Sequence, residues 1–328
     1  MHPDLAAVAA SHNGVFLRRD AVRCGYTDDE ISRLVRRQEW YKLRRGAYCE
    51  RALLANDTHG DLEAFLRTQA CALVLAPPAF ASHSSASSVL ELPRWGTRPD
   101  ECHFTRPSRH AGRREAGVIH HEAHLGADET TMLRGVRTTS LERTPLDVSR
   151  EFGFAPGLVA ADAALRKGAD PAMMAAIATG MKQWADARPV QAVLGFADGG
   201  GHSPGETLTR IAAREAGLHN LTTQFEVRDG CFLAYVDVVA PDWNLALEFD
   251  GRLKYRRTRD KADPATDDAD IVWAEKMRED RLSDLGFEVL RVVWADLFGG
   301  RRVLLIRRIQ QAAERGRRRS PGIAALLA

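Results

Sequence analysis

Four acidic residues in the last third of the chain have the types and spacing of a metal-binding site. Asp237 lies in an alternating run that predicts a β-strand, and Glu248 and Asp250 share one face of the next predicted strand. A hairpin register would place Asp237 beside Glu248, and Glu206 would join them from the preceding helix. Acids converge in an apolar sheet around a cation, because like charges repel and burial raises carboxyl pKa values. We expect the cofactor Mg²⁺ or Mn²⁺, with Asp237, Glu248 and Asp250 as ligands.

A metal ion at these acids would support hydrolysis of a phosphodiester, because it holds the phosphate and lowers the pKa of a bound water. Lys254 follows the third predicted strand and would stabilise charge on the phosphate or assist the attacking water. Lys276 and Asp280, four residues apart on one helix face, are secondary candidates. The alternative is a strand that ends in an Asp-Gly turn and exposes its acids. The expected catalytic residues are Asp237, Glu248, Lys254 and Glu206.

The elements around these residues predict one small domain over residues 201–300. The pattern reads helix, three strands, helix and strand, or αβββαβ, and the Asp229-Gly230 pair predicts the first hairpin turn. Residues 301–328 follow as a basic amphipathic helix and tail, because residues 301–319 hold eight arginines and one acid. That helix is either a solvated end or a contact with DNA phosphates, with a membrane surface ranked below both.

This segment resembles the DUF559 family and is similar to the very-short-patch-repair (Vsr-like) branch of the PD-(D/E)XK nuclease superfamily. The resemblance implies a restriction-endonuclease-like fold, with Asp237 and Glu248 as metal-binding acids and Glu206 as the helix acid. Asp250 stands where the superfamily usually has lysine, so either Lys254 takes that role or Asp250 is a further ligand. The resemblance rests on Ser203-Pro-Gly-Glu206, Val236-Asp-Val238, Leu247–Tyr255, Glu275–Leu282 and Leu285–Arg291.

Residues 1–56 predict a winged helix-turn-helix. The run Phe16–Cys24 predicts a short helix, Thr27 and Glu30 form a capping box for the next one, and Trp40–Tyr48 predicts a β-hairpin. An arginine-bearing helix can lie in the major groove, and a basic wing can neutralise phosphates. A small protein-interaction domain is the alternative. The expected DNA-binding residues are Arg33, Arg36 and Arg37 on the helix and Lys42, Arg44 and Arg45 on the wing.

This part resembles the N-terminal domain of the AbiEi-type antitoxin family. The resemblance implies a winged-helix DNA binder that represses its own operon, and a possible cognate toxin-like partner. It rests on Gly14-Val-Phe16, Asp20-Ala21, Gly25-Tyr26, Ile31–Leu34 and Tyr41–Tyr48. Residues 57–200 also resemble the middle domain of this family, through Ala81–Ala86 and Thr139–Thr144.

The middle segment predicts an α/β domain with helices over residues 62–75, from Ser82 and from Thr139, the last with a capping box to Glu142. A strand is predicted from Val118. His120, His121 and His124 suggest a metal site, but on a strand His120 and His124 lie roughly 13 Å apart, too far to share an ion. His83 is expected to cap or pack at a helix start rather than to catalyse.

The composition is that of a globular protein and excludes several classes. The chain has 328 residues, a net charge of +2, 45% hydrophobic and 27% charged residues, which argues against a disordered chain. The longest apolar stretch, residues 70–81, is too short to span a bilayer, and no secretory signal is visible. Five scattered cysteines without a CxxC motif indicate neither a disulfide framework nor a zinc knuckle and favour a cytoplasmic location.

The sequence therefore predicts an α+β multidomain protein. Its expected parts are a winged helix-turn-helix (1–56), an α/β middle domain (57–200), an αβββαβ nuclease domain (201–300) and a basic helix and tail (301–328). The expected function is a metal-dependent endonuclease that a winged helix directs to double-stranded DNA. The alternative is a non-catalytic, antitoxin-like transcriptional regulator whose nuclease fold has lost activity. RNA as the substrate ranks below both.

Overall fold

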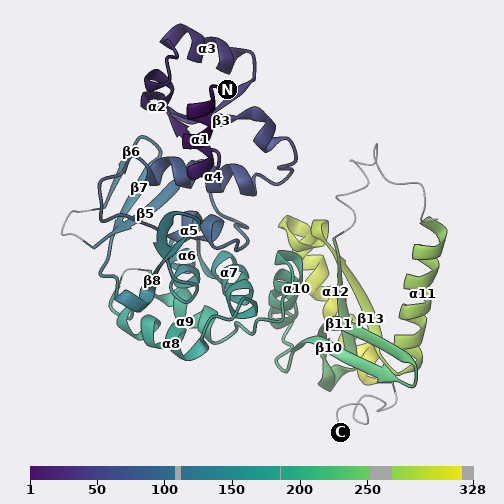
Figure 1. Cartoon of the computed structure of the whole chain (residues 1–328). Helices are drawn as coiled ribbons and strands as arrows, with labels where there is room; N and C mark the ends of the chain where they lie inside the picture. The colour runs from purple at the N-terminus through teal and green to yellow at the C-terminus, as the bar shows by residue number, and fades with distance from the viewer. Residues whose placement is uncertain (108–111, 185, 252–267, 320–328) are drawn as a thin grey trace. The chain divides into compact units, whose positions relative to one another are not determined.

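The computed structural model describes residues 1–107, 112–184, 186–251 and 268–319 (Figure 1). The chain forms two compact units, residues 1–197 and 198–328, which divide at the glycine-rich loop after Ala197. Helices and sheets occur in both units, so the fold is mixed α+β. None of the helices in the described ranges is long and apolar enough to cross a membrane.

The first 50 residues are winged-helix-like. Thr27 and Glu30 form the predicted capping box: the Thr27 hydroxyl accepts from the Glu30 N–H, and the Glu30 carboxylate accepts from the Thr27 N–H at 2.8 Å. The predicted hairpin is confirmed, with Gly46 in its turn at a φ of 76°. The elements are α1 (Pro3–Ser11), β1 (Phe16–Leu17), α2 (Arg18–Arg23), α3 (Asp28–Arg36), β2 (Trp40–Arg44) and β3 (Ala47–Glu50), with strand order β1-β3-β2.

The predicted helix over Phe16–Cys24 was wrong at its start. Phe16 and Leu17 pair with Tyr48 and Ala47 of β3, and α2 begins only at Arg18. The Phe16 ring is fully buried and packs edge-on against Trp40, with ring centroids 4.7 Å apart. This aromatic contact favours an extended backbone at Phe16 over the local helical pattern.

The rest of the first unit is a six-stranded mixed sheet with helices. Its hydrophobic core includes Leu17 and Leu43 of the winged-helix segment together with Phe65 and Phe104 of the middle segment, so both segments build one core. The predicted helix over 62–75 and the strand from Val118 are confirmed as α4 and β7. The elements are α4 (Asp61–Ala72), β4 (Phe80–Ala81), α5 (His83–Val89), β5 (Cys102–Arg106), β6 (Arg113–Glu115), β7 (Val118–Glu122), β8 (Thr130–Leu133), β9 (Val136–Thr139), α6 (Thr144–Phe152), α7 (Phe154–Arg166), α8 (Pro171–Gly180) and α9 (Arg188–Leu194), with strand order β6-β7-β5-β4-β9-β8.

The capping box predicted for Thr139 and Glu142 was wrong. Thr139 is the last residue of β9 and pairs with Thr130, while α6 begins at Thr144. The Glu142 carboxylate instead accepts a hydrogen bond from the Asp170 N–H at 3.2 Å. The spacing of Thr139 and Glu142 matches the motif, but pairing with β8 holds the backbone of Thr139 in a strand, where it cannot cap a helix.

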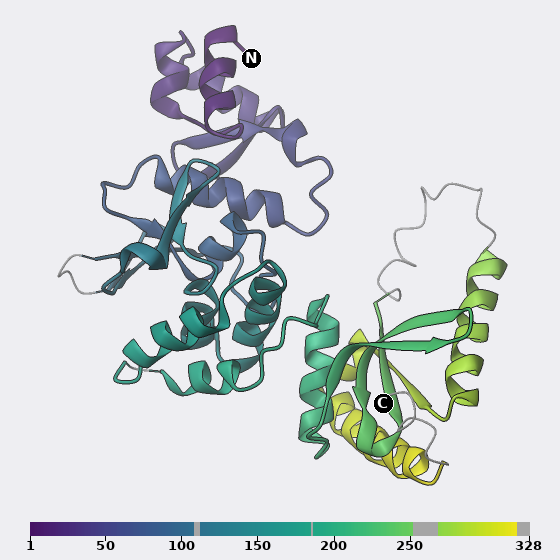
Figure 2. The same cartoon turned by 60° about the horizontal axis from the view of Figure 1, so that its bottom comes forward.

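The second unit is a four-stranded sheet with three helices in its described part. The order along the chain is helix, three strands, helix, strand and helix, and the sheet order is β10-β11-β12-β13, with only β12 and β13 parallel. Helices α10 and α12 contact each other, whereas α11 lies beside the tip of the β10–β11 hairpin (Figures 1 and 2), where Arg281 pairs with Asp229. The elements are α10 (Pro204–Glu215), β10 (Thr222–Asp229), β11 (Phe232–Ala240), β12 (Leu245–Asp250), α11 (Asp268–Asp284), β13 (Glu288–Val293) and α12 (Gly299–Arg317).

The basic C-terminal helix is part of this unit rather than a solvated end. Leu305, Ile309 and Ala312 of α12 are fully buried. Its arginines form ion pairs within the unit, since Arg302 pairs with Glu215 at 2.9 Å and Arg315 pairs with Glu288 at 2.7 Å. Much of the positive charge that suggested phosphate contacts therefore stabilises the packing of α12.

The capping box of α3 predicts a local stability effect. Thr27→Ala removes the hydroxyl that accepts from the Glu30 N–H, which costs about 1 kcal/mol. Amide exchange in α3, measured by mass spectrometry on the full chain, should therefore speed up about five-fold. Ser32→Ala, at an exposed position of the same helix, is the control. Equal exchange rates in the two variants would contradict this role of Thr27.

Candidate functional site

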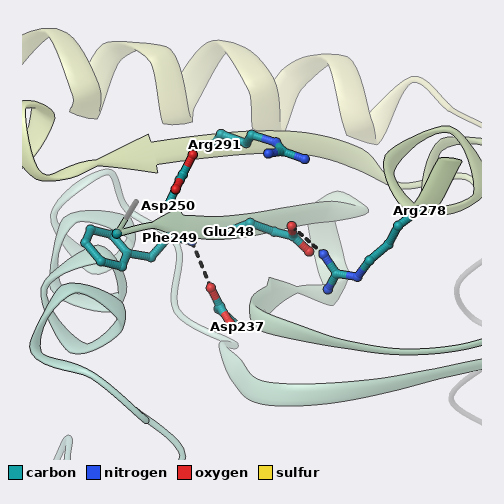
Figure 3. Close-up of a pocket in the computed structure, with 7 residues that line it drawn as sticks. Asp237, Glu248, Phe249, Asp250, Arg278 and Arg291 are labelled. Carbon is teal, nitrogen blue, oxygen red and sulfur yellow. Dashed lines mark hydrogen bonds and ion pairs between the residues drawn. The ribbon is translucent and has the colours of Figure 1, made fainter. Parts of the chain in front are cut away.

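A cavity of about 220 Å³ lies beside β11 and the C-terminal end of β12, and three of the four predicted acids line it (Figure 3). Asp237 enters it from β11, and Glu248 and Asp250 enter it from β12. Glycine 251 follows β12 directly, and the two arginines that line the cavity come from α11 and β13. The lining residues are Asp237, Glu248, Phe249, Asp250, Gly251, Arg278 and Arg291.

Strand pairing brings Asp237 and Glu248 to this cavity. The β11–β12 ladder pairs Val238 with Leu247, and continuing that register by one residue sets Asp237 opposite Glu248. One carboxylate oxygen of Asp237 accepts a hydrogen bond from the Phe249 N–H at 2.8 Å. Burial raises the pKa of Asp237, and the negative charge of Glu206 raises that pKa further. The site therefore concentrates negative charge where solvent can screen it little.

Glu206 reaches the site through a glutamine that the sequence reasoning missed. The Gln224 amide donates to Glu206 at 3.2 Å and to Asp237 at 3.5 Å. Gln224 lies in β10 across from Asp237 and has a φ of 47°, a left-handed conformation that is uncommon for residues other than glycine. Glu206 also accepts from the Ser203 hydroxyl and the His202 N–H, both at 2.9 Å, so it caps α10 as well.

Arg278 is the main feature of the cavity that the sequence reasoning did not single out. It donates to Glu248 at 2.7 Å (Figure 3). It also donates to the Tyr235 carbonyl at 2.6 Å. The secondary candidates Lys276 and Asp280 are exposed and do not line the cavity. Residues two apart on a helix lie about 200° apart around its axis. Arg278 therefore lies on nearly the opposite face of α11 from Lys276, and it is the face of Arg278 that lines the cavity.

The remaining candidates divide between the cavity and the undescribed segment. Asp250 lines the cavity together with Arg291, which also pairs with Glu279 of α11 at 3.0 Å. Lys254 lies outside the described residues. The acids and arginines of the cavity therefore come from three strands and one helix that are far apart in the sequence.

A glycine allows α10 to approach the cavity closely. A Cβ atom at Gly205 would lie 2.1 Å from the Phe249 ring, whereas a Cβ atom at Gly251 would lie 3.4 Å from the same ring. The Phe249 ring also packs edge-on against Trp294, with centroids 5.1 Å apart. The Phe249 backbone N–H binds Asp237, so the packing of this ring supports the position of the acid.

The predicted DNA-binding residues differ in exposure. Arg33, Arg36 and Arg37 are exposed at the C-terminal end of α3, and Lys42 and Arg45 are exposed on the wing. Arg44 is half-buried and donates to the Cys71 sulfur at 2.9 Å. The register shift between Lys42 and Arg44 explains the difference, because a bulge turns the residues that follow it away from the face of Lys42.

One comparison with known proteins concerns this winged-helix segment. Residues 3–51 match the family model of AbiEi antitoxin transcriptional regulators. The matched residues run from α1 through β3, the part of the chain that is winged-helix-like. No curated protein matches the chain.

The Gly205 contact gives a test of how the cavity is built. Gly205→Ala forces a methyl group into the Phe249 ring and should lower the free energy of unfolding of the second unit by about 1–3 kcal/mol. Amide exchange at the N-terminal turn of α10 and in β12 would report the loss. The matched control is Gly251→Ala, which meets the same ring at an ordinary contact distance. Comparable effects of the two substitutions would refute the proposed packing role of Gly205.

Proposed function

We propose that the chain is a metal-dependent endonuclease that its winged helix directs to double-stranded DNA. The single observation that carries the proposal is the cavity that Asp237, Glu248 and Asp250 line. Carboxylates around one small cavity concentrate negative charge there, and a bound cation would neutralise part of that charge. The order helix, three strands, helix, strand and the sequence resemblance to DUF559 and Vsr-like proteins support a restriction-endonuclease-like fold.

The donor set fits a hard divalent ion. Mg²⁺ and Mn²⁺ prefer carboxylate oxygens, and Asp237, Glu248 and Asp250 offer such oxygens on one side of the sheet. The raised pKa of Asp237 reflects its burial and the nearby charge of Glu206, both of which a cation would offset. When bound, the ion would supply a Lewis acid for the phosphate and a water of lowered pKa.

The other residues of the cavity have roles that follow from their charge. Arg278 and Arg291 place positive charge at the cavity, where they would hold phosphate oxygens of the DNA backbone. Arg278 shares Glu248 with the ion in this scheme, and so limits how strongly Glu248 binds metal. Glu206 positions Asp237 through Gln224, and Lys254 would assist the attacking water.

The winged-helix segment supports DNA as the substrate. Its match to transcriptional regulators and the exposed Arg33, Arg36 and Arg37 favour docking of α3 in the major groove. Lys42 and Arg45 of the wing would contact neighbouring phosphates. Arg44 is left out of this surface because its guanidinium contacts Cys71.

A second candidate function is a DNA-binding, antitoxin-like regulator without cleavage activity. Three features favour it. The family that residues 3–51 match consists of transcriptional regulators, and Arg278 already neutralises Glu248. The third feature is Asp250, which stands where the nuclease superfamily usually has lysine and so favours loss of cleavage activity. Such a regulator would bind DNA through the same winged helix and act with a toxin-like partner.

Cleavage of plasmid DNA separates the two functions. Wild-type protein with Mg²⁺ or Mn²⁺ should nick supercoiled plasmid, and Asp237→Asn and Glu248→Gln should each lower the rate about 100-fold or more, because each removes a metal ligand. Asp284→Asn, an exposed change on α11, should cleave like wild type. Absence of cleavage with either metal, alongside a specific gel shift, would favour the regulator.

The salt dependence of DNA binding tests the winged-helix surface. Each of Arg33→Ala and Arg36→Ala should flatten the slope of log affinity against log salt by about one, if each arginine neutralises one phosphate. Lys182→Ala removes one exposed charge outside residues 3–51 and serves as the control. Unchanged slopes for both arginine variants, measured by fluorescence anisotropy, would place the DNA surface elsewhere.

A further inference from the structure

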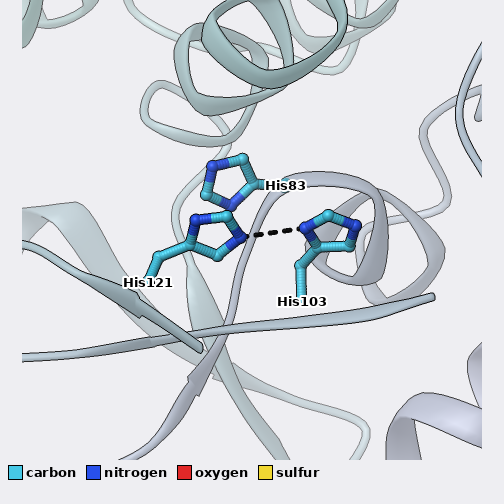
Figure 4. A group of neighbouring side chains, drawn as sticks. All are labelled: His83, His103 and His121. Carbon is cyan, nitrogen blue, oxygen red and sulfur yellow. Dashed lines mark hydrogen bonds between the residues drawn. The ribbon is translucent and has the colours of Figure 1, made fainter. Parts of the chain in front are cut away.

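Two buried histidines and one partly buried histidine lie close together in the first unit, far along the chain from the carboxylate cavity. His83 begins α5, His103 lies on β5, and His121 lies on the neighbouring parallel strand β7. Each offers a ring nitrogen, and the three nitrogens all lie within 4.8 Å of one another. The His83 and His121 rings stack with centroids 3.8 Å apart, and His103 faces the edge of His121 (Figure 4).

The ring nitrogens are close enough together to reach one ion after the stacked His83 and His121 rings turn toward it. His103 Nδ1 and His121 Nε2 are 2.9 Å apart. Two nitrogens on a tetrahedral ion with bonds of about 2.0–2.1 Å lie roughly 3.3 Å apart, so a shift of about half an ångström admits the ion. His83 Nδ1 contacts the Ser82 hydroxyl at 2.9 Å, which leaves its Nε2 as the ligand atom.

The second nitrogen of His103 faces a carboxylate. His103 is fully buried, and its Nε2 makes no hydrogen bond to any residue that the structure describes. The Glu101 carboxylate lies 3.7 Å from this nitrogen. Histidines that bind metal through one nitrogen commonly donate the other N–H to a carboxylate, which fixes the ring and strengthens the ligand. Glu101 is itself held by Arg114 at 2.7 Å, so it is positioned for this role.

The surroundings of the cluster disfavour protonated histidines. Burial lowers the pKa of His103 to about 4 and that of His121 to about 3, and it lowers the pKa of His83 as well. The positive charges of Arg150 and Arg143 lower the pKa of His83 further.

We propose that His83, His103 and His121 bind one divalent transition-metal ion, with Zn²⁺ as the natural occupant of three imidazole ligands. Three protein ligands leave a fourth position for water. His121 is only partly buried, which gives the ion a route in. Neither the winged-helix match nor the proposed nuclease function assigns this site.

The sequence suggests a different set of histidines from the one that the structure brings together. His120, His121 and His124 are neighbours in the sequence, but His120 and His124 would lie too far apart on a strand to share an ion. His120 lies on the opposite face of β7 from His121, and His124 lies beyond the end of that strand. The pairing of β5 with β7 brings in His103, and no spacing along the chain indicates that pairing.

Cobalt binding to the tag-free full chain tests the proposal. Metal-stripped wild type should take up one Co²⁺ with the intense visible absorption of a four-coordinate nitrogen site, and Zn²⁺ should remove that absorption. His103→Gln and His121→Gln should abolish it, and Glu101→Gln should weaken Co²⁺ binding about 10-fold. His124→Gln, an exposed histidine close by, and Glu248→Gln in the carboxylate cavity should both retain it.

The wild-type spectrum decides the proposal even where a variant fails to fold, as circular dichroism would reveal. A wild type without four-coordinate Co²⁺ absorption overturns it. So does absorption that survives in folded His103→Gln and His121→Gln. Loss of the absorption in Glu248→Gln would place the ion in the second unit, and this result would also overturn the proposed histidine site.

Discussion

The charge balance of one cavity, which Asp237, Glu248 and Asp250 line together with Arg278 and Arg291, is the constraint on which the candidate site of the second unit depends. Carboxylates that share a small cavity tend to protonate or to acquire positive partners, because the surrounding protein screens their charge poorly. Burial and the charge of Glu206 raise the pKa of Asp237, and Arg278 pairs with Glu248. A divalent ion would also neutralise these carboxylates. The charges of the cavity are therefore compatible with both proposed functions, a metal-dependent nuclease and a regulator without cleavage activity.

The packing around the cavity keeps these charges in place. Phe249 contributes both to the polar contacts and to the packing. Its backbone N–H binds Asp237, and its ring fills the space beside Gly205 and Trp294. Gln224 adds a polar link from Asp237 to the capped end of α10. Helix α12 closes the unit with buried aliphatic side chains and arginine ion pairs, so its charge is structural in large part.

Features set by neighbouring residues could be predicted from the sequence. The Thr27–Glu30 capping box, the hairpin at Gly46 and the strand that carries Glu248 and Asp250 all follow from local spacing and turn chemistry. Features set by pairing between distant segments could not. Phe16 is a strand residue because it pairs with Tyr48 of β3, which lies about thirty residues further along the chain.

The same limit applies to the candidate sites. Arg278 belongs to the Glu275–Leu282 motif, yet only the position of α11 beside the sheet shows which face of that helix lines the cavity. Arg44 was removed from the DNA surface by a bulge that alternation along the strand does not indicate. His103 carries no sequence signal at all, because its partners are fixed by the pairing of β5 with β7 and by the start of α5.

Uptake of a hard divalent ion by the acids of the second unit can be measured by isothermal titration calorimetry of the full chain with Mg²⁺, with the Asp237→Asn variant beside wild type. We expect saturable Mg²⁺ uptake by wild type and its loss in the variant. A wild type that takes up no Mg²⁺, or a variant that takes it up equally well, would rule out these acids as the metal site.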